Sequence, residues 1–277
     1  MNVAAGRLRQ GWRRAAVGLC LFAALLGSTR VTRLAVSPTV GVDSPALSVL
    51  LVALGGSRGI LSEILWWRIG DLQRQNRYAE LVPLTDLLVT LEPSSPDVWI
   101  FNAWNLAYNV SVMHQESEER WRWVCRGVAL IRRGLRHAPA SQPLLRQMGW
   151  LFEDKIGGRN DDAASYYREH LAELGIPEDA GDFAQRVGFV PDWSLPKTHA
   201  LYWYVRAGYA GDTLRVATAL LRQTDDPALI PFYLETARAA WDDLALAQCE
   251  QVLDNVRALR SRYPRPELDA FLKEATL

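Results

Sequence analysis

The chain has 277 residues, of which 49% are hydrophobic and 22% are charged, a balance typical of a folded protein rather than a disordered one. Residues 1–33 contain six Arg and no acidic residue, which leaves 25 basic against 31 acidic residues in the remainder. Because nucleic-acid binding depends on basic surfaces that contact phosphates, this acidic remainder argues against a nucleic-acid partner.

The N-terminal 33 residues combine a basic stretch with an apolar run, Ala15–Gly27, in the order found in export signals. No clean pair of small residues near Leu25–Thr29 provides a cleavage site, so we favour an uncleaved membrane-anchor helix over a cleaved signal peptide and over a buried core helix. Four Arg precede the run and two follow it. The positive-inside rule therefore predicts a single-pass protein of the cytoplasmic (inner) membrane, with its N-terminus in the cytoplasm and its body on the periplasmic or outer side.

Residues 34–58 are interpreted as a linker with a short apolar segment. Val36–Pro45 has the Pro, Gly and Ser content of a linker. The following apolar stretch, Ala46–Gly56, is shorter than the roughly 20 residues of a spanning helix, so a buried packing segment is favoured over a second membrane pass.

From residue 59 to residue 277 the hydrophobic pattern predicts an all-α domain. Apolar residues recur at helical spacing, prolines stand where the apolar stripes end, and no sustained alternation or Asn-Gly turn indicates strands.

Part of this domain resembles the tetratricopeptide (TPR) repeat, a 34-residue helix pair. The segment Arg77–Pro93 resembles the second half of such a repeat, and Trp99, Ala103 and Leu106 then fall at packing positions of the next one. Ala103–Asn109 and Gly149–Gly157 are also similar to segments of uncharacterised bacterial membrane-anchored TPR-like proteins. The resemblance implies a TPR-like α-solenoid of about five helical pairs, preceded by the membrane-anchor helix.

The repeat register predicts further helices and two irregular stretches. An insertion is expected around Ser111–Glu118, and an irregular stretch at Gly175–Leu195. The expected later helices are Glu119–His137, Asp161–Leu174, Thr198–Gly208, Thr213–Gln223, Ala228–Asp242 and Leu244–Arg262.

The sequence offers little support for catalytic, metal or cofactor motifs. No His-Glu-x-x-His or Cys-x-x-Cys motif occurs. The Gly-rich stretch Gly55–Gly59 matches Gly-x-Ser-x-Gly in its letters, but it is not followed by Gly-Lys-Ser/Thr and is interpreted as a flexible break before a helix. The adjacent acids at Asp161-Asp162, Asp225-Asp226 and Asp242-Asp243 are interpreted as helix starts or turns, where carboxylates satisfy free N–H groups. We therefore expect no enzyme, cofactor, metal ion or small-molecule substrate.

Aromatic residues crowd residues 66–150. Packing between helices is the favoured explanation, and a binding surface is the functional alternative. In the TPR register, the inner face of the first helices would form a peptide-binding groove. The predicted groove residues are Ile100, Trp104, Tyr108, Arg146, Trp150 and Asp154, with Asn105 and Asn109 as amides that bracket an extended backbone.

The sequence thus predicts a membrane-anchored scaffold or adaptor of the bacterial cell envelope, which binds a peptide or helix of another protein. The alternatives are a structural subunit of a membrane complex and an envelope enzyme that acts on glycans.

Overall fold

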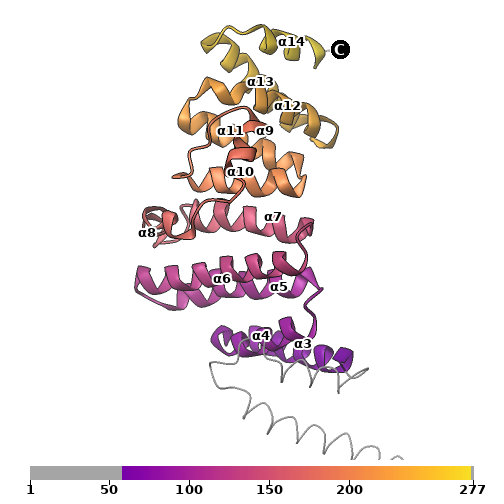
Figure 1. The fold of residues 1–277 in the computed structure, drawn as a ribbon, viewed down its shortest axis with the longest axis vertical. Helices are drawn as coiled ribbons and strands as arrows, with labels where there is room; N and C mark the ends of the chain where they lie inside the picture. The colour runs from indigo at the N-terminus through magenta and orange to yellow at the C-terminus, as the bar shows by residue number, and fades with distance from the viewer. Residues whose placement is uncertain (1–57, 276–277) are drawn as a thin grey trace, which may run out of the picture. The chain divides into compact units, whose positions relative to one another are not determined.

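A computed structural model describes residues 58–275 of the chain (Figure 1). The chain divides into two compact units, Met1–Trp66 and Trp67–Leu277, and the boundary falls within helix α3 (Arg58–Arg74). The predicted membrane anchor at residues 1–33 lies outside the described residues, as does the linker except for its last position. Within residues 58–275, no helix combines the length and apolar character needed to cross a membrane.

The prediction of an all-α fold is confirmed for the described residues, which form helices and connecting turns. The α-helices after α3 are α4 (Leu81–Leu91), α5 (Pro96–Trp104), α6 (Ser117–His137), α7 (Gln142–Trp150), α8 (Ala164–Glu169), α9 (Ala180–Val187), α10 (Pro196–Ala207), α11 (Ala210–Thr224), α12 (Ile230–Ala240), α13 (Leu246–Arg262) and α14 (Pro266–Glu274).

Short helical segments extend or connect these helices. Two of them are π-helical, namely η3 (Asn105–Val110), which continues α5, and η5 (Leu151–Ile156), which continues α7. The 3-10 segments are η2 (Tyr78–Glu80), η4 (Ser111–Met113), η6 (Leu171–Leu174), η7 (Pro227–Leu229) and η8 (Trp241–Asp243).

Proline and glycine mark several helix ends. Pro96 begins α5 and Pro196 begins α10, at positions where the missing backbone N–H would have no partner inside the helix. Helices α9 and α10 end at Gly188 and Gly208, each with a φ of 73°. This left-handed conformation closes a helix and carries little steric cost for glycine alone.

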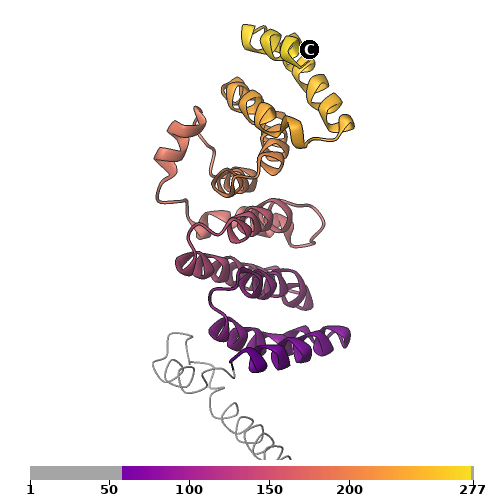
Figure 2. The same ribbon diagram turned by 90° about the vertical axis from the view of Figure 1, so that its right-hand side faces the viewer.

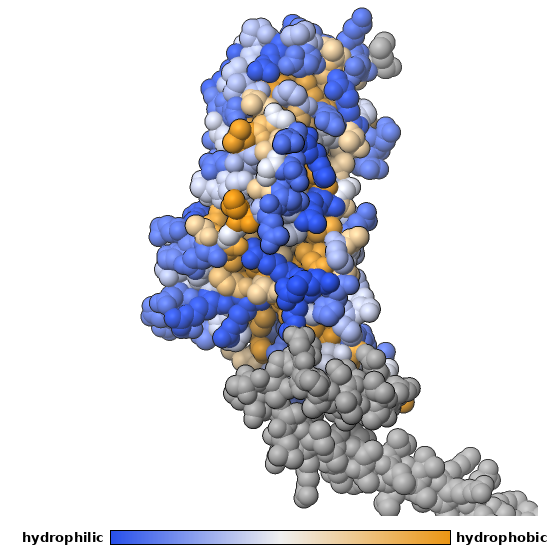
Figure 3. Space-filling model, in the orientation of Figure 1, coloured by the Kyte–Doolittle hydropathy of each residue, from blue (hydrophilic) through white to orange (hydrophobic). Residues whose placement is uncertain are grey.

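Within the second unit, most helices pack against a helix that is close in the sequence, and α7 packs on α10 although α8 and α9 lie between them in the chain (Figures 1 and 2). Helix α4 packs on α5, α5 and α6 pack on each other and on α7, α7 packs on α10, α10 on α11, and α11 on α12. The interfaces bury large aromatic side chains, including Trp99, Phe152, Tyr202 and Tyr233. On the surface seen in Figure 3, hydrophobic residues form separate patches among hydrophilic ones.

The predicted helix at Glu119–His137 corresponds closely to α6, and the expected insertion at Ser111–Glu118 begins as η4, which follows the π segment of the preceding helix. The predicted helices at Thr198–Gly208 and Thr213–Gln223 correspond to α10 and α11.

Two other boundaries were wrong. The stretch Gly175–Leu195 is not wholly irregular, because it contains α9, whose Phe183 packs edge-on against Tyr202 at 5.2 Å between ring centroids. The expected continuous helix Asp161–Leu174 is instead the short α8 and η6, which are separated at His170. Helix α14 was not predicted.

Candidate functional site

Two tryptophans of the predicted groove are exposed at the ends of neighbouring helices. Trp104 is the last residue of α5 and is 38% exposed, and Trp150 is the last residue of α7 and is 41% exposed. Helices α5 and α7 pack against each other. Large aromatic side chains that remain accessible on a packed helical surface are the usual anchors of protein–protein interfaces.

Tyr108 lies beside Trp104 and within reach of the Trp150 side chain. Its ring stacks on Trp104 with 5.9 Å between centroids, and its hydroxyl donates a 2.9 Å hydrogen bond to Asp154 Oδ2. Burial, followed by the charge and hydrogen bond of Asp154, raises the pKa of Tyr108, whereas the nearby Trp150 side chain acts in the opposite direction. Tyr108 therefore fixes Trp104 and connects it to the segment that follows Trp150.

The two π-helical segments give both tryptophans the same local setting. Trp104 directly precedes η3 and Trp150 directly precedes η5. A π-helical turn widens the helix by one residue and changes the direction of the side chains that follow, and such turns are frequent at functional sites. The recurrence of this arrangement in two packed helices supports treating Trp104, Tyr108, Trp150 and Asp154 as one surface.

The predicted role of Asn105 was wrong, because this side chain is fully buried. Its amide Nδ2 donates to the Tyr78 carbonyl at 3.5 Å, and its Oδ1 accepts a 3.1 Å hydrogen bond from Asn109. The two amides therefore bind each other instead of bracketing an extended backbone. Ile100 is half-buried.

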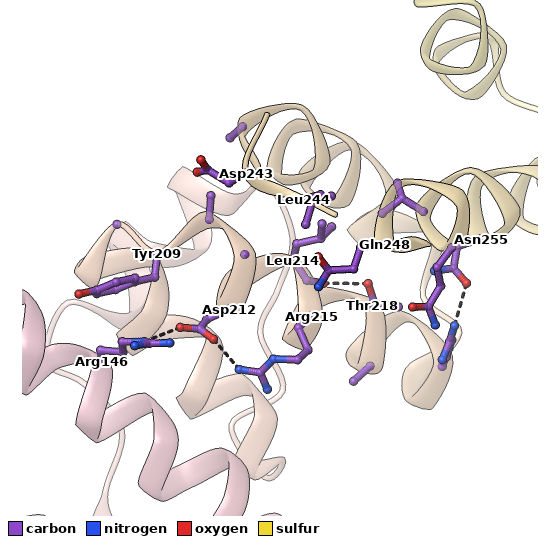
Figure 4. Close-up of a pocket in the computed structure, with 18 residues that line it drawn as sticks. Arg146, Tyr209, Asp212, Leu214, Arg215, Thr218, Asp243, Leu244, Gln248 and Asn255 are labelled. Carbon is purple, nitrogen blue, oxygen red and sulfur yellow. Dashed lines mark hydrogen bonds and ion pairs between the residues drawn. The ribbon is translucent and has the colours of Figure 1, made fainter. Parts of the chain in front are cut away.

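Arg146 connects this surface to a cavity of about 800 Å³, which it helps to line (Figure 4). Its guanidinium binds Asp212 at 2.7 Å, and Arg215 binds the other oxygen of the same carboxylate at 2.7 Å. Arg215 also pairs with Glu153, which accepts a 2.8 Å hydrogen bond from Tyr204. This chain of charges joins α7 and η5 to α10 and α11. No sequence pattern indicates it, because its contacts between helices link residues that are 51 to 66 positions apart.

A buried ionic cluster lies next to Tyr108, whose ring centroid is 5.2 Å from Lys155 Nζ. Asp161 binds both Lys155 and Arg120, and it also accepts hydrogen bonds from the Ala163 N–H and the Tyr167 hydroxyl. Burial alone would raise the pKa of Asp161. The net effect is a lowered pKa, because Asp161 accepts hydrogen bonds from Lys155 and Ala163 and lies near the charges of Lys155 and Arg120. Asp161 is thus an ionised structural anchor that holds α6, η5 and the start of α8 together.

One residue of the other acid pairs has a local capping role. Asp226 accepts a 2.9 Å hydrogen bond from the Ala228 N–H and so caps η7, as the sequence predicted for a carboxylate in this position. Among residues 58–275, no three His, Cys, Asp or Glu side chains converge in a way that could hold a metal ion.

Comparisons with protein-family models, with curated proteins and with solved structures gave no match for this chain. The candidate site is therefore defined by its own geometry: two exposed tryptophans fixed by Tyr108 and Asp154, with Arg146 leading into a charged cavity.

Proposed function

We propose that the chain is a membrane-anchored scaffold of the bacterial cell envelope, and that the surface formed by Trp104, Tyr108, Arg146, Trp150 and Asp154 binds a peptide segment or helix of another protein. The observation that carries this proposal is the exposure of Trp104 and Trp150 on two packed helices, each side chain held beside Tyr108.

The proposed scaffold is a TPR-like α-solenoid of about five helical pairs. The order of packing supports it, because α4 contacts α5, α6 contacts α7, and α11 contacts α12, as the second helix of one pair contacts the first helix of the next in a repeat array. Each such pair buries its apolar face only against its neighbours. A stacked array of this kind presents a continuous surface along which a partner segment can lie.

The chemistry of the surface suits a polypeptide partner. Tryptophan and arginine are enriched among the residues that contribute most to protein interfaces, because they bury a large area and also offer polar contacts. The Arg146 side chain is about half exposed at 53%, and its guanidinium also lies 4.7 Å from the ring centroid of Tyr209. A partner would find aromatic faces at Trp104 and Trp150 and a fixed cation beside them.

The proposed location rests on the N-terminal sequence, in which Ala15–Gly27 is preceded by four Arg. A fusion of alkaline phosphatase after residue 277 should be active and a fusion of green fluorescent protein should be dark. An inactive phosphatase together with a bright fluorescent fusion would show the opposite orientation.

The binding proposal is tested with a Trp104→Ala, Trp150→Ala double variant of the full-length chain, expressed in its own host and captured for quantitative mass spectrometry. We expect specific partners to fall at least tenfold relative to the unmodified chain. The control is a Val190→Ala, Leu246→Ala double variant, which removes two apolar side chains that are 88% and 85% exposed elsewhere. A folded tryptophan variant that retains every partner would overturn the proposal.

A further inference from the structure

Two cavities meet where helices α11, α12 and α13 come together. One has a volume of about 800 Å³ and the other about 280 Å³, and both are lined by Thr218, Arg222 and Asn255. Figure 4 shows Asn255 and Thr218 at one end of the larger cavity, away from Arg146 and Asp212. The smaller cavity is of a size that suits a single side chain or a small molecule.

The wall of the smaller cavity contains a hydroxyl group without an acceptor. Tyr233 is 0% exposed, and its hydroxyl donates no hydrogen bond to any of the described residues. A buried O–H group without an acceptor is unfavourable, because it has lost its hydrogen bond to water. Burial also raises the pKa of Tyr233, whereas side-chain hydrogen bonds of Asn255 and Thr218 and the charge of Arg222 lower it, so this hydroxyl keeps its proton and remains a donor.

The charges around the cavities leave one arginine without a carboxylate. Arg146 and Arg215 share Asp212, and Arg262 pairs with Asp225. By contrast, Arg222 donates a 2.8 Å hydrogen bond to the neutral Asn255 Oδ1. No carboxylate within the described part of the chain lies at ion-pair distance from the Arg222 guanidinium.

We propose that the junction of these two cavities is a carboxylate-binding site, in which Arg222, Asn255 and Tyr233 are the donors. The planar guanidinium of Arg222 has N–H groups left to donate, and such groups bind carboxylates with two parallel hydrogen bonds. Asn255 can add its Nδ2, and Tyr233 can add the hydroxyl that otherwise has no acceptor. The carboxylate is supplied either by an acidic residue of a polypeptide in the larger cavity or by a small free dicarboxylate.

This site lies on α11, α12 and α13 and shares no donor with the surface around Trp104 and Trp150. The experiment below therefore tests it separately from the proposed function. Its test is a titration of the full-length chain, labelled with ¹⁵N, followed by NMR of the arginine side chains. The Arg222 Nε–H resonance is assigned by its loss in Arg222→Gln. The probes are succinate, the blocked peptide acetyl-Ala-Glu-Ala-amide and its Gln counterpart, each compared with sodium chloride at equal ionic strength.

We expect the Arg222 resonance to shift saturably with succinate or the Glu peptide, but not with the Gln peptide or with chloride. Tyr233→Phe should weaken that binding at least threefold while leaving the ligand-free chain folded, because the deleted hydroxyl donates no hydrogen bond within the described residues. The control, Arg257→Gln, removes an exposed arginine of α13 that pairs with Asp254 and should leave binding unchanged.

The two sources of the carboxylate give different results. Tenfold tighter binding of the Glu peptide than of succinate would assign the site to a polypeptide, and the reverse order would assign it to a free dicarboxylate. The proposal is overturned if neither probe shifts the Arg222 resonance, if Tyr233→Phe binds as the unmodified chain does, or if Arg257→Gln weakens binding as much as the Tyr233 variant does.

Discussion

Tyr108 and Asp154 occupy matching positions in two packed helices and are joined by a 2.9 Å hydrogen bond. Tyr108 lies four residues after Trp104, and Asp154 lies four residues after Trp150. The bond therefore ties together the two segments that carry the exposed tryptophans. Because burial and the Asp154 charge raise the pKa of Tyr108, its hydroxyl remains the donor of this bond at physiological pH.

Removal of this hydroxyl should loosen the connection between the two helices. Tyr108→Phe is expected to lower the free energy of unfolding by about 1–3 kcal/mol, since it deletes a hydrogen bond to a half-buried carboxylate. Urea unfolding followed by circular dichroism measures the change. In the control, Tyr78→Phe, the lost hydroxyl bonds Asn76 at the surface, and the effect should stay within about 0.5 kcal/mol. Equal effects of the two variants would contradict the role given to Tyr108.

The ionic cluster of Asp161 should be sensitive to substitution. Lys155 is 5% exposed and Arg120 is 15% exposed, so Asp161→Asn leaves two poorly solvated cations without their carboxylate. The expected loss is about 3–5 kcal/mol at pH 7. Asp254→Asn, which disrupts an exposed pair with Arg257, should cost less than about 1 kcal/mol.

The same cluster predicts a pH dependence. The pKa of Asp161 is lowered in the folded chain, so its stabilising contribution is complete above the ordinary carboxyl value of about 3.9 and is lost as pH falls through the lower folded value. The stability difference between the unmodified chain and Asp161→Asn should therefore shrink below about pH 4. Urea unfolding at pH 7, 5, 4 and 3 checks this, and a difference that does not vary with pH would count against it.

Gly149 allows α7 and α10 to approach closely. A Cβ atom at this position would lie 2.7 Å from Cε1 of the buried Tyr204 ring. Gly149→Ala should therefore destabilise the chain by about 1–3 kcal/mol through overpacking, although alanine favours helix. Gly181→Ala in α9 has no atom within 4 Å of the added Cβ and should instead be neutral or stabilising by up to about 1 kcal/mol. Thermal unfolding of both variants distinguishes the two environments.

His199 should remain neutral under mildly acidic conditions. It is buried against Phe152 at 4.7 Å between ring centroids, and burial lowers its pKa to about 4. The charged form is disfavoured in the folded chain, so stability should fall as pH drops from about 6.5 towards 4. An NMR titration of the imidazole, assigned by its loss in His199→Gln, should give a midpoint near 4. A midpoint near 6.5 would show that the ring is not confined in this way.

Helix boundaries that depend on local signals could be predicted from the sequence. Gly208 closes α10 in the left-handed conformation, and α6 carries acids in its first turn and basic residues in its last, as the helix dipole favours. The exposure of Trp104, Trp150 and Arg146 agrees with the prediction made from the TPR-like register, which placed them on the inner face of the first helices.

Features that depend on distant partners could not be predicted. Helix α9 is eight residues long and is held by tertiary contacts, including the 2.6 Å hydrogen bond from Tyr202 to Asp179 at its start. The buried amide of Asn105 donates a hydrogen bond to the carbonyl of Tyr78 in η2, which lies 27 positions earlier in the chain. The π-helical turn that begins at Asn105 also changes the direction in which the following side chains point. The cation partner Arg120 is 41 positions from Asp161. No local pattern in the sequence reports such contacts.

Site-specific photocrosslinking tests most directly whether Trp104 and Trp150 contact another protein. A photoreactive phenylalanine analogue would replace Trp104, Trp150 or, as the control, the exposed Leu246 of α13 in the full-length chain in living cells. The binding surface predicts the same crosslinked polypeptide from positions 104 and 150 and none of it from position 246. Crosslinks from position 246 alone, or no crosslinked polypeptide from 104 and 150 in a folded chain, would contradict it.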